Sequence, residues 1–440
     1  MKFYDRKDEL AELGDIRKKA FSDHSRFTVI TGRRRIGKTS LILKALEGKN
    51  PIYLFVGRKS EAVLCREFGR EIAEKLGVFV PEEIRTIGSL FRYLMEVVKD
   101  KSFDLIIDKF QELSNVNPSI YAEMQDIWDR NKEKTHINLI VSGSVYSLMH
   151  EIFQGKKEPL FGRADNIMYI RPFGIATLKQ IMKDYSPKYT KEDLLSFFAI
   201  TGGVPKYVEL FCDNNALTLK KMVEYAVREN SPFTEEGRNL LIEEFGKNYA
   251  TYFSILGAIA EGINTQNQIQ MLVGGKSIGG QLKRLIEDYE VLSRMRPIFS
   301  NSGTHAVRYE IKDPFIKFWF YYFDRNRALI EIRNFGHLRK IVLENFPTYS
   351  GDMLERYFRQ MLAESGEYVE IGSWWKPGKE QYQIDIVAIR TEKNHADVIE
   401  VKRSKRNFRR AEFEEKVEHL KRKELMGYEL KTYCLTMDDM

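Results

Sequence analysis

An eight-residue loop near the start of the chain constrains its fold more than any other feature. Residues 32–39 read Gly-Arg-Arg-Arg-Ile-Gly-Lys-Thr, which fits the pattern GxxxxGK followed by Ser or Thr. A β-rich run at 27–31 precedes the loop, and a helical stretch at 39–46 follows it. In this context the glycines let backbone N–H groups wrap phosphates, and the helix N-terminus adds positive potential. The loop therefore predicts an α/β domain that binds ATP.

The residues of this loop have separate expected roles. We expect Lys38 to reach the β- and γ-phosphate oxygens and the Thr39 hydroxyl to ligate Mg²⁺. The three consecutive arginines are unusual: each either contacts phosphate, an acidic neighbour or another domain, or is a solvated charge. The expected nucleotide-binding residues of the loop are Gly32, Arg33, Arg34, Arg35, Ile36, Gly37, Lys38, Thr39 and Ser40.

An acidic residue at the end of a later strand is expected to complete the Mg²⁺ shell. Asp108 ends the apolar run 103–108 and has that position. The next residue, where a base that polarises the attacking water is expected, is Lys109. A protonated lysine cannot act as that base, and its charge favours retention of the bound nucleotide. The sequence thus predicts ATP binding with slow hydrolysis.

Two further groups are candidates for the γ-phosphate. Ser142 ends the apolar run 137–142 and Ser144 follows it. These serines either hydrogen-bond the γ-phosphate or its water, or are ordinary strand-to-loop residues. Arg163 comes after a loop and is either an arginine finger, acting in cis or in trans, or a solvated arginine. Ser142 and Arg163 are therefore the expected catalytic residues near the nucleotide.

The order of apolar and helical patterns predicts four domains. Apolar runs without alternation suit parallel strands that are buried on both faces, and their alternation with helices predicts a three-layer α/β sheet. Helical patterns then dominate, and a hairpin and a last α/β segment follow. The expected domains are a P-loop domain (1–175), a helical lid (176–245), a winged helix (246–312) and a C-terminal α/β domain (313–440).

The last two domains are each expected to combine helices with strands. The winged helix is expected to have helices at 249–261, 265–272 and 277–289, and a hairpin between 290–292 and 307–311 that turns at Asn301-Ser302-Gly303. The C-terminal domain is expected to have a helix at 353–363, strands at 366–375, 382–390 and 396–402, and closing charged helices.

Composition and termini restrict the compartment. The net charge of +7 permits nucleic-acid contacts and equally suits a soluble protein with a modest positive excess. The three cysteines lie far apart and form no metal pattern, which favours a reducing compartment. The N-terminus lacks the apolar core of a signal peptide, and no apolar run approaches the roughly 18 residues of a spanning helix. We expect a cytoplasmic protein without membrane contact.

Motifs along nearly the whole chain resemble one family. They are Phe3-Tyr4-Asp5-Arg6, the loop at 32–39, Ile107-Asp108-Lys109, Ser142-Gly143-Ser144, Phe161-Gly162-Arg163, Gly202-Gly203-Val204-Pro205 and Asp313-Pro314-Phe315. With these motifs the chain resembles the STAND-type AAA+ ATPases of archaea and bacteria that carry a C-terminal DUF234 domain. The resemblance implies that Tyr4 and Arg6 lie by the adenine and that Gly202 begins a sensor-2-like helix. Lys109 departs from the family's Glu.

The resemblance also implies that the C-terminal domain is similar to PD-(D/E)XK nucleases. Glu400 and Lys402, two apart on an expected strand, project to one face, and Asp385 on a paired strand can face them. Asp385 and Glu400 would hold Mg²⁺, Lys402 would position the nucleophile or stabilise charge, and Glu355 on a preceding helix would join them. Gln383 departs from the family's frequent Glu. An active nuclease, an inactive nucleic-acid-binding relative and a structural domain all stay open.

Basic residues near this set suit contacts with DNA or RNA. Lys402, Arg403, Lys405, Arg406, Arg409 and Arg410 lie within nine residues, and either contact phosphates or form a solvated face. In the winged module, Lys276, Lys283 and Arg284 either read DNA or belong to a packing element. Besides ATP or ADP, the expected partners are therefore nucleic acid and a protein partner or a second copy of the chain.

Two hypotheses of function follow. In the first, the nucleotide state controls a metal-dependent nuclease-like domain that acts on nucleic acid. In the second, the chain is an ATP-bound signalling or scaffold switch whose C-terminal domain binds a partner without cleavage. Lys109 favours the second, whereas the Glu355, Asp385, Glu400 and Lys402 set favours the first.

Overall fold

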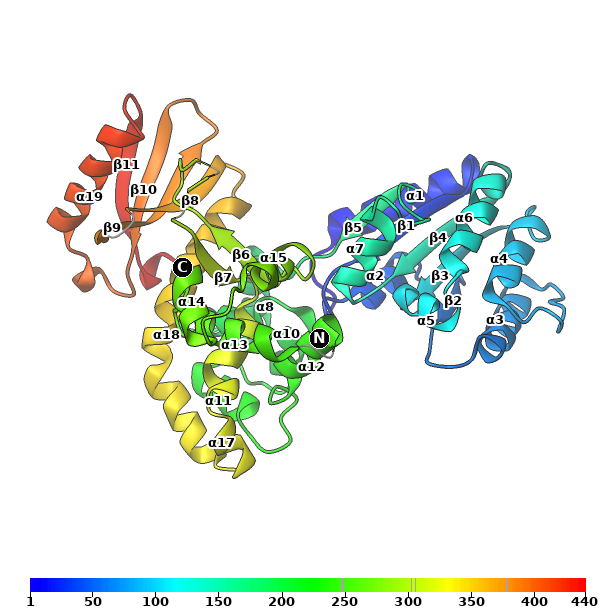
Figure 1. Ribbon diagram of the computed structural model, residues 1–440, viewed down its shortest axis with the longest axis horizontal. Coiled ribbons are helices and arrows are strands. Elements are labelled where there is room, and N and C mark those ends of the chain that lie inside the picture. The colour runs from blue at the N-terminus through cyan, green and yellow to red at the C-terminus, as the bar shows by residue number, and fades with distance from the viewer. Residues whose placement is uncertain (247–248, 302, 305, 377–378) are drawn as a thin grey trace. The chain divides into compact units, whose positions relative to one another are not determined.

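The chain consists of two compact units. The computed structural model describes residues 1–440 except 247–248, 302, 305 and 377–378. The first unit is Asp5–Arg171, and the second joins Met1–Tyr4 to Pro172–Met440 (Figure 1). Among the described residues, no helix combines the length and the apolar character needed to cross a bilayer.

The Asp5–Arg171 unit contains a parallel sheet with strand order β2-β3-β4-β1-β5. Its strands are β1 (Arg26–Thr31), β2 (Ile52–Phe55), β3 (Ser102–Asp108), β4 (His136–Ser142) and β5 (Asn166–Tyr169). The predicted α/β class is confirmed. The sequence analysis did not predict β5, a four-residue edge strand in which Met168 alone is buried.

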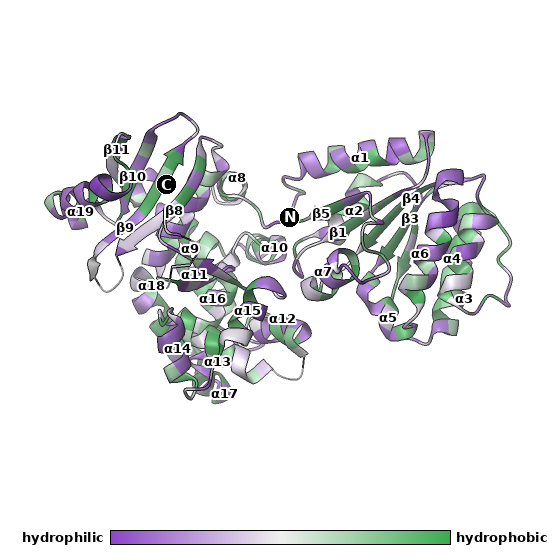
Figure 2. Cartoon of the chain, turned by 45° about the horizontal axis from the view of Figure 1, so that its top comes forward, coloured by the Kyte–Doolittle hydropathy of each residue, from purple (hydrophilic) through white to green (hydrophobic). Residues whose placement is uncertain are grey.

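Helices cover both faces of this sheet, so that alternate strand residues enter two different cores (Figure 2). Leu105 and Ile107 of β3 lie in the larger core, whereas Ile106 between them lies in the smaller one. The larger core is built with α3 (Glu61–Leu76), α4 (Ile87–Glu96), α6 (Ile120–Asn131) and α7 (Tyr146–Gln154), and the smaller core with α1 (Lys7–Ser22) and α2 (Lys38–Ala45). Two short helical segments, η1 (Phe110–Glu112) and α5 (Leu113–Val116), follow β3.

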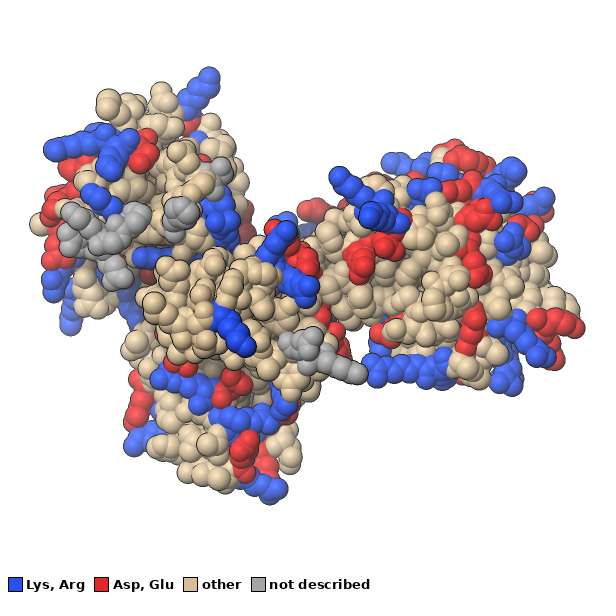
Figure 3. Space-filling view, viewed as in Figure 1, with Lys and Arg blue, Asp and Glu red and all other residues tan. Residues whose placement is uncertain are grey.

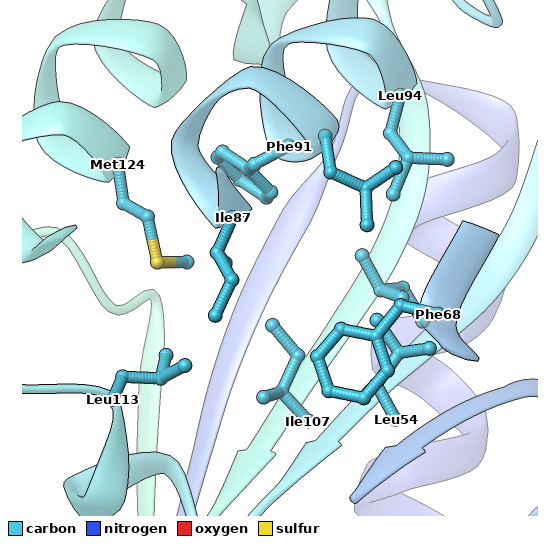
Figure 4. A pocket seen from close by; sticks show the side chains of 10 residues that line it. Leu54, Phe68, Ile87, Phe91, Leu94, Ile107, Leu113 and Met124 are labelled. Atoms are coloured by element: carbon cyan, nitrogen blue, oxygen red, sulfur yellow. The ribbon is translucent and has the colours of Figure 1, made fainter. Parts of the chain in front are cut away.

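The larger core encloses a small apolar cavity of about 20 Å³. Ile87, Phe91 and Leu94 of α4 point into it from one side and Met124 of α6 from another (Figure 4). An apolar cavity of this size stays dry. It is therefore a packing feature of this face of the sheet and lies apart from the phosphate loop.

The second unit starts with a helical bundle and a winged module. The bundle contains α8 (Ile175–Tyr185), α9 (Lys191–Thr201), α10 (Pro205–Asp213), α11 (Leu219–Ala226) and α12 (Glu236–Phe245). The winged module contains α13 (Tyr249–Ala260), α14 (Gln266–Leu272), α15 (Gly279–Glu287) and the antiparallel strands β6 (Leu292–Met295) and β7 (Arg308–Ile311). Ser302, in the expected turn of the hairpin, lies outside the described residues.

The C-terminal part combines a long helix with a four-stranded mixed sheet. After α16 (Pro314–Phe318), the π-helical segment η4 (Trp319–Asp324) and α17 (Arg327–Glu331), α18 runs from Phe335 to Glu364. The sheet has the order β11-β10-β9-β8, with β8 (Tyr368–Lys376), β9 (Lys379–Arg390), β10 (His395–Val401) and β11 (Glu429–Leu435), and α19 (Arg410–Lys423) covers it. The β10–β11 pair is parallel, and the other two pairs are antiparallel.

Two expectations for this part were wrong. The helix expected at 353–363 begins at Phe335, because Pro347 lies inside a continuous helix instead of ending one. The chain was expected to finish in charged helices, but residues 429–435 form the edge strand β11. Its polar side chains are tolerated because an edge strand is only partly buried.

One hydrophobic core extends through the bundle, the winged module, α18 and one face of the C-terminal sheet. Phe198 of α9 and Tyr357 of α18 stack edge to face with ring centroids 5.6 Å apart. The other face of the sheet packs on α19 in a separate core. The C-terminal sheet is thus packed onto the bundle on one side.

Candidate functional site

The phosphate loop has the backbone that only its glycines can adopt easily. Gly32 has φ +141°, and a Cβ there would lie 2.7 Å from the carbonyl oxygen of Ile170. Gly37 has φ +88° and directly precedes α2. Ile36 between them is fully buried in the smaller core and anchors the loop to the sheet. Local sequence thus folds this segment into a cradle of backbone N–H groups at a helix N-terminus.

Lys38 lies folded into this cradle. Its side chain is buried, and its Nζ donates hydrogen bonds to the carbonyl oxygens of Gly32 at 2.8 Å and Arg33 at 3.0 Å. The ammonium group is therefore held inside the loop, where a phosphate would lie. The arginines 33–35 are half-buried, and Ser40 is exposed on the first turn of α2.

Asp108 is the centre of a hydrogen-bond cluster at the end of β3. Its Oδ2 accepts from the Thr39 hydroxyl at 3.3 Å and from the Tyr53 hydroxyl at 2.5 Å. Its Oδ1 accepts from the Ser142 hydroxyl at 2.5 Å and from the backbone N–H of Lys109 at 2.9 Å. The carboxylate and the Thr39 hydroxyl are hard oxygen donors side by side, which fits Mg²⁺ bound together with a nucleotide. Tyr53 was missed by the sequence reasoning, because nothing local marks a strand tyrosine as facing the site.

Lys109 points its charge at an aromatic ring. Its Nζ lies 4.9 Å from the centroid of the Phe55 ring, at the end of β2. Its backbone is left-handed, with φ +58°. The position directly after Asp108 therefore presents a cation to β2 and no carboxylate that could act as a base.

Three other predicted nucleotide residues have partners of their own. The guanidinium of Arg163 pairs with Asp129 of α6, with Nη2 and Oδ2 3.0 Å apart. The Tyr4 hydroxyl donates to Asp184 at 2.7 Å within the second unit. Arg6 belongs to the first unit, where its Nη2 donates to the carbonyl oxygen of Arg171 at 2.5 Å. The roles expected for them, arginine finger and adenine contact, stay predictions.

In the C-terminal sheet, a β-bulge places Asp385. Between the pairs Gly372–Val387 and Trp374–Ile384, β9 has one residue more than β8. Such a bulge turns a side chain away from the regular alternation of the strand. The Asp385 carboxylate accepts from the backbone N–H of Val401 at 2.8 Å, so that it faces the end of β10.

Asp385 and Glu400 meet at the ammonium group of Lys402. Lys402 Nζ lies 2.9 Å from Glu400 Oε1 and 3.4 Å from Asp385 Oδ2. Lys416, from α19, adds a second ammonium 3.3 Å from Glu400 Oε1, and the sequence reasoning had no means to assign α19 to this site. Burial and the neighbouring Glu400 carboxylate raise the pKa of Asp385 above its ordinary value.

Glu355 on α18 approaches the same place. Burial, followed by the charges of Asp385 and Asp352, raises its pKa to about 8. Glu355 is therefore within electrostatic reach of Asp385 and Lys402, and its membership of one site with Glu400 stays a prediction.

The fit of this site to a metal ion is partial. Glu400 Oε2 is buried without a hydrogen-bond partner, so a cation there would satisfy it. Among the described residues, however, no group of three or more His, Cys, Asp and Glu side chains is arranged to hold a metal. A metal shared by three carboxylates is thus not found, and the pair Asp385 and Glu400 stays a predicted ligand set.

The winged module packs against the C-terminal sheet and forms hydrogen bonds with it. The N–H of Ile298, in the loop between β6 and β7, donates to the carbonyl oxygen of Ser373 at 2.9 Å, and its side chain enters the core against α19. The Arg308 guanidinium lies 4.6 Å from the Trp375 ring and donates to Gln383 at 3.0 Å. These contacts pack the β6–β7 hairpin against the C-terminal sheet, and the DNA-reading alternative stays a prediction.

The predicted basic residues divide between internal pairs and exposed charges. Arg403 donates to Ser350 of α18 and pairs with Glu192 of α9, so it clamps the sheet to the bundle. Arg409 and Arg410 pair with Glu412 and Glu414 of α19. Lysine and arginine side chains stand out from this domain (Figure 3). Lys405 and Arg406 are exposed. In α15, Lys283 lies 3.7 Å from Glu287.

The fold and the loop together define a P-loop ATPase domain. A family described as an ATPase domain predominantly from Archaea matches residues 3–211, and the family DUF234, described as archaeal and bacterial proteins of unknown function, matches residues 319–416. An uncharacterized protein of Methanocaldococcus jannaschii is 31% identical over 409 residues, which cover 91% of this chain and 87% of that protein. The chain belongs to this family of archaeal ATPases with a C-terminal DUF234 domain.

Further similarities are shorter or concern the fold alone. A second uncharacterized protein of Methanocaldococcus jannaschii is 35% identical over 65 residues, 15% of this chain and 63% of that protein. The solved structure of a Walker-type ATPase of Pyrococcus abyssi is similar with a TM-score of 0.54 and 19% identity, covering 72% of this chain and 96% of that chain. That likeness shows a shared fold.

Proposed function

We propose that the chain is a STAND-type AAA+ switch whose nucleotide state controls a C-terminal nuclease-like domain that acts on nucleic acid. The observation that carries the proposal is the meeting of Asp385, at the bulge of β9, with Glu400 and Lys402 at the end of β10. Lys402 Nζ lies 2.9 and 3.4 Å from the two carboxylates. A strand pair that presents two carboxylates and a lysine at one point is suited to phosphodiester chemistry.

The residues would share the work of cleavage as follows. Mg²⁺, when bound, lowers the pKa of a coordinated water and neutralises charge on the scissile phosphate. Asp385 and Glu400 would hold it, because their oxygens already face one point. Lys402 would stabilise charge that develops on the phosphate, and Lys416 would keep Glu400 in place. The exposed Lys405 and Arg406 would contact the phosphate backbone without reading sequence.

Contacts inside the second unit support control by the ATPase unit. The chain leaves the first unit after Arg171, and the N–H of Phe173 donates to the carbonyl oxygen of Gly203 at 2.8 Å. Two residues later, the N–H of Ile175 donates to the carboxylate of Glu364 at 2.9 Å. Glu364 and Glu355 lie on the same helix, α18. A displacement of residues 171–175 would thus reach α18, the helix that carries Glu355. Control by nucleotide requires that ATP has different affinities for the two positions of this segment.

A cleavage assay tests the proposal. The full chain is incubated with single- and double-stranded DNA and RNA, Mg²⁺ or Mn²⁺, and ATP. We expect cleavage that falls at least roughly 100-fold in Asp385→Ala, because loss of a residue that merely supports a metal ligand already costs roughly 10- to 100-fold. Glu415→Gln, at an exposed position of α19, is the matched control and should keep full activity. No cleavage of any nucleic acid with either metal would reject the nuclease.

That rejection would leave the second candidate, an ATP-bound scaffold switch without cleavage. Two observations favour it: Lys402 already neutralises both carboxylates, and Lys109 stands where a hydrolytic base is expected. Its specific expectation is slow ATP turnover, which suits a long-lived ATP state.

Substitution of Lys109 tests whether this residue limits the rate of ATP hydrolysis. We expect slow phosphate release from the wild type and a rise of roughly 100-fold in Lys109→Glu, because a positioned general base contributes about that factor. Lys99→Glu makes the same charge change at an exposed position and should leave the rate unchanged. A wild type that already hydrolyses ATP fast would show that another residue supplies the base.

A further inference from the structure

Tyr53 touches the proposed magnesium site without belonging to any of its motifs. On β2 it pairs with Ile106 of β3, two register steps before the pair Phe55–Asp108, and it packs against the smaller core. Its hydroxyl donates to Asp108 Oδ2 at 2.5 Å.

The hydroxyl of Tyr53 meets that of Thr39 at the same carboxylate oxygen. Thr39 donates to Asp108 Oδ2 at 3.3 Å, and it is also a hydrogen-bond neighbour of the Tyr53 hydroxyl. On the opposite oxygen, Ser142 and the N–H of Lys109 fill the positions around Oδ1. Ser142 and Tyr53 therefore hold the carboxylate from two sides and fix its rotation, with Oδ2 turned to Thr39.

We propose that Tyr53 is a positioning residue of the Mg²⁺–nucleotide site: its hydroxyl fixes the Asp108 carboxylate beside Thr39 and thereby sets how tightly Mg²⁺ is held with ATP. This inference rests on the proposed ATP binding by the loop. The physical reason is preorganisation, since a carboxylate that must first be turned toward a metal binds it more weakly. Loss of such an outer hydrogen-bond donor costs roughly 10- to 100-fold in metal affinity.

Binding of a fluorescent ATP analogue to the full chain provides the test. Affinity is measured in EDTA and over a series of free Mg²⁺ concentrations. For Tyr53→Phe we expect an unchanged affinity in EDTA and a roughly 10-fold higher Mg²⁺ concentration for half-maximal tightening. Tyr93→Phe is the matched control. It removes a hydroxyl of α4 that donates to the carbonyl oxygen of Phe79, and it should behave as the wild type.

A double-mutant cycle shows whether the effect passes through Asp108. In an Asp108→Ala background, Tyr53→Phe should change the Mg²⁺ dependence no further. An unchanged Mg²⁺ dependence of Tyr53→Phe, or an equal loss of affinity with and without Mg²⁺, would overturn the positioning role. Absence of binding by the wild type in both conditions would instead overturn the proposed ATP site and the inference with it.

Discussion

At the scale of single residues, Asp397 shows how the C-terminal sheet tolerates a buried charge. Its carboxylate accepts from the Tyr368 and Tyr433 hydroxyls at 2.9 Å each. Two nitrogens of Arg390 donate to it at 2.8 Å each. Burial by itself would raise the pKa of Asp397, but the hydrogen bonds from Arg390, Tyr433 and Tyr368 lower it below its ordinary value. A fully bonded carboxylate of this kind ties β8, β9 and β11 to β10.

The first prediction concerns Asp397→Asn. We expect a loss of about 3 kcal/mol in the free energy of unfolding at pH 7, because a buried ion pair loses one partner. Since the folded pKa is lowered, the stabilisation is present above the unfolded value of about 3.9 and is lost as the pH falls through the folded value. The deficit of the variant should therefore shrink on acidification. Urea titrations followed by tryptophan fluorescence measure it, and a constant deficit would contradict the assignment.

Residue types and spacing were sufficient to predict one contact of the candidate site. The period of two along a strand brought Glu400 and Lys402 to one face, and the lysine contacts the carboxylate. The extra residue in β9 that turns Asp385 toward Val401 has no local signature, because it depends on how β8 pairs with β9. Tyr53 and Lys416 were missed for the same reason: their roles depend on which elements are neighbours in space.

At the scale of elements, α18 connects the C-terminal sheet to the bundle. Glu364 in its last turn accepts from the N–H of Ile175 at 3.0 and 2.9 Å, and so caps the start of α8. Gln360, one turn earlier, donates to Glu364 at 2.8 Å and holds it in place. A carboxylate at a helix N-terminus is also stabilised by the helix dipole.

The second prediction concerns this cap. In Glu364→Ala, opening of the first turn of α8 should become easier by about 1 kcal/mol, the typical value of a lost N-cap. Amide hydrogen exchange of the first residues of α8 should then be roughly fivefold faster. Glu344→Ala, at an exposed position of the same helix, is the control. Equal exchange in both variants would show that Glu364 does not hold α8.

Helices and strands were predictable where their sequence has a clear pattern of apolar residues. The first four strands of the parallel sheet are dominated by buried apolar residues, and all four were predicted. The strand β11 alternates as Glu-Leu-Lys-Thr-Tyr-Cys-Leu and was read as part of a charged tail, because an edge strand buries too few residues to stand out. The start of α18 was missed because a proline usually ends a helix, whereas Pro347 lies inside this one.

At the scale of the whole molecule, the two units have separate hydrophobic cores. Both cores of the sheet in the first unit consist of residues from that unit, whereas Tyr4 packs into the core of the second. Each unit thus buries its apolar surface by itself, and cooperative unfolding is expected within a unit.

The third prediction follows from these separate cores. Calorimetry of the full chain should show two unfolding transitions, and a fragment of residues 5–171 should melt near one of them. Mg²⁺ with ATP should raise the midpoint temperature of that transition. At a ligand concentration of 100 times the dissociation constant, binding adds about 2.7 kcal/mol to the free energy of unfolding. A single transition, together with a fragment that does not fold, would show that the units depend on each other.

The hydrogen bond from Arg6 to the carbonyl oxygen of Arg171 has a consequence for the architecture of the gene product. It joins the beginning and the end of the ATPase unit, so this unit enters and leaves the rest of the chain at one place. Topologically the unit is a guest domain inserted between residues 4 and 172 of a host, the arrangement that tolerates exchange most readily. A chimaera that accepts the ATPase unit of a relative between these residues should therefore fold, and would let one host respond to another guest's nucleotide.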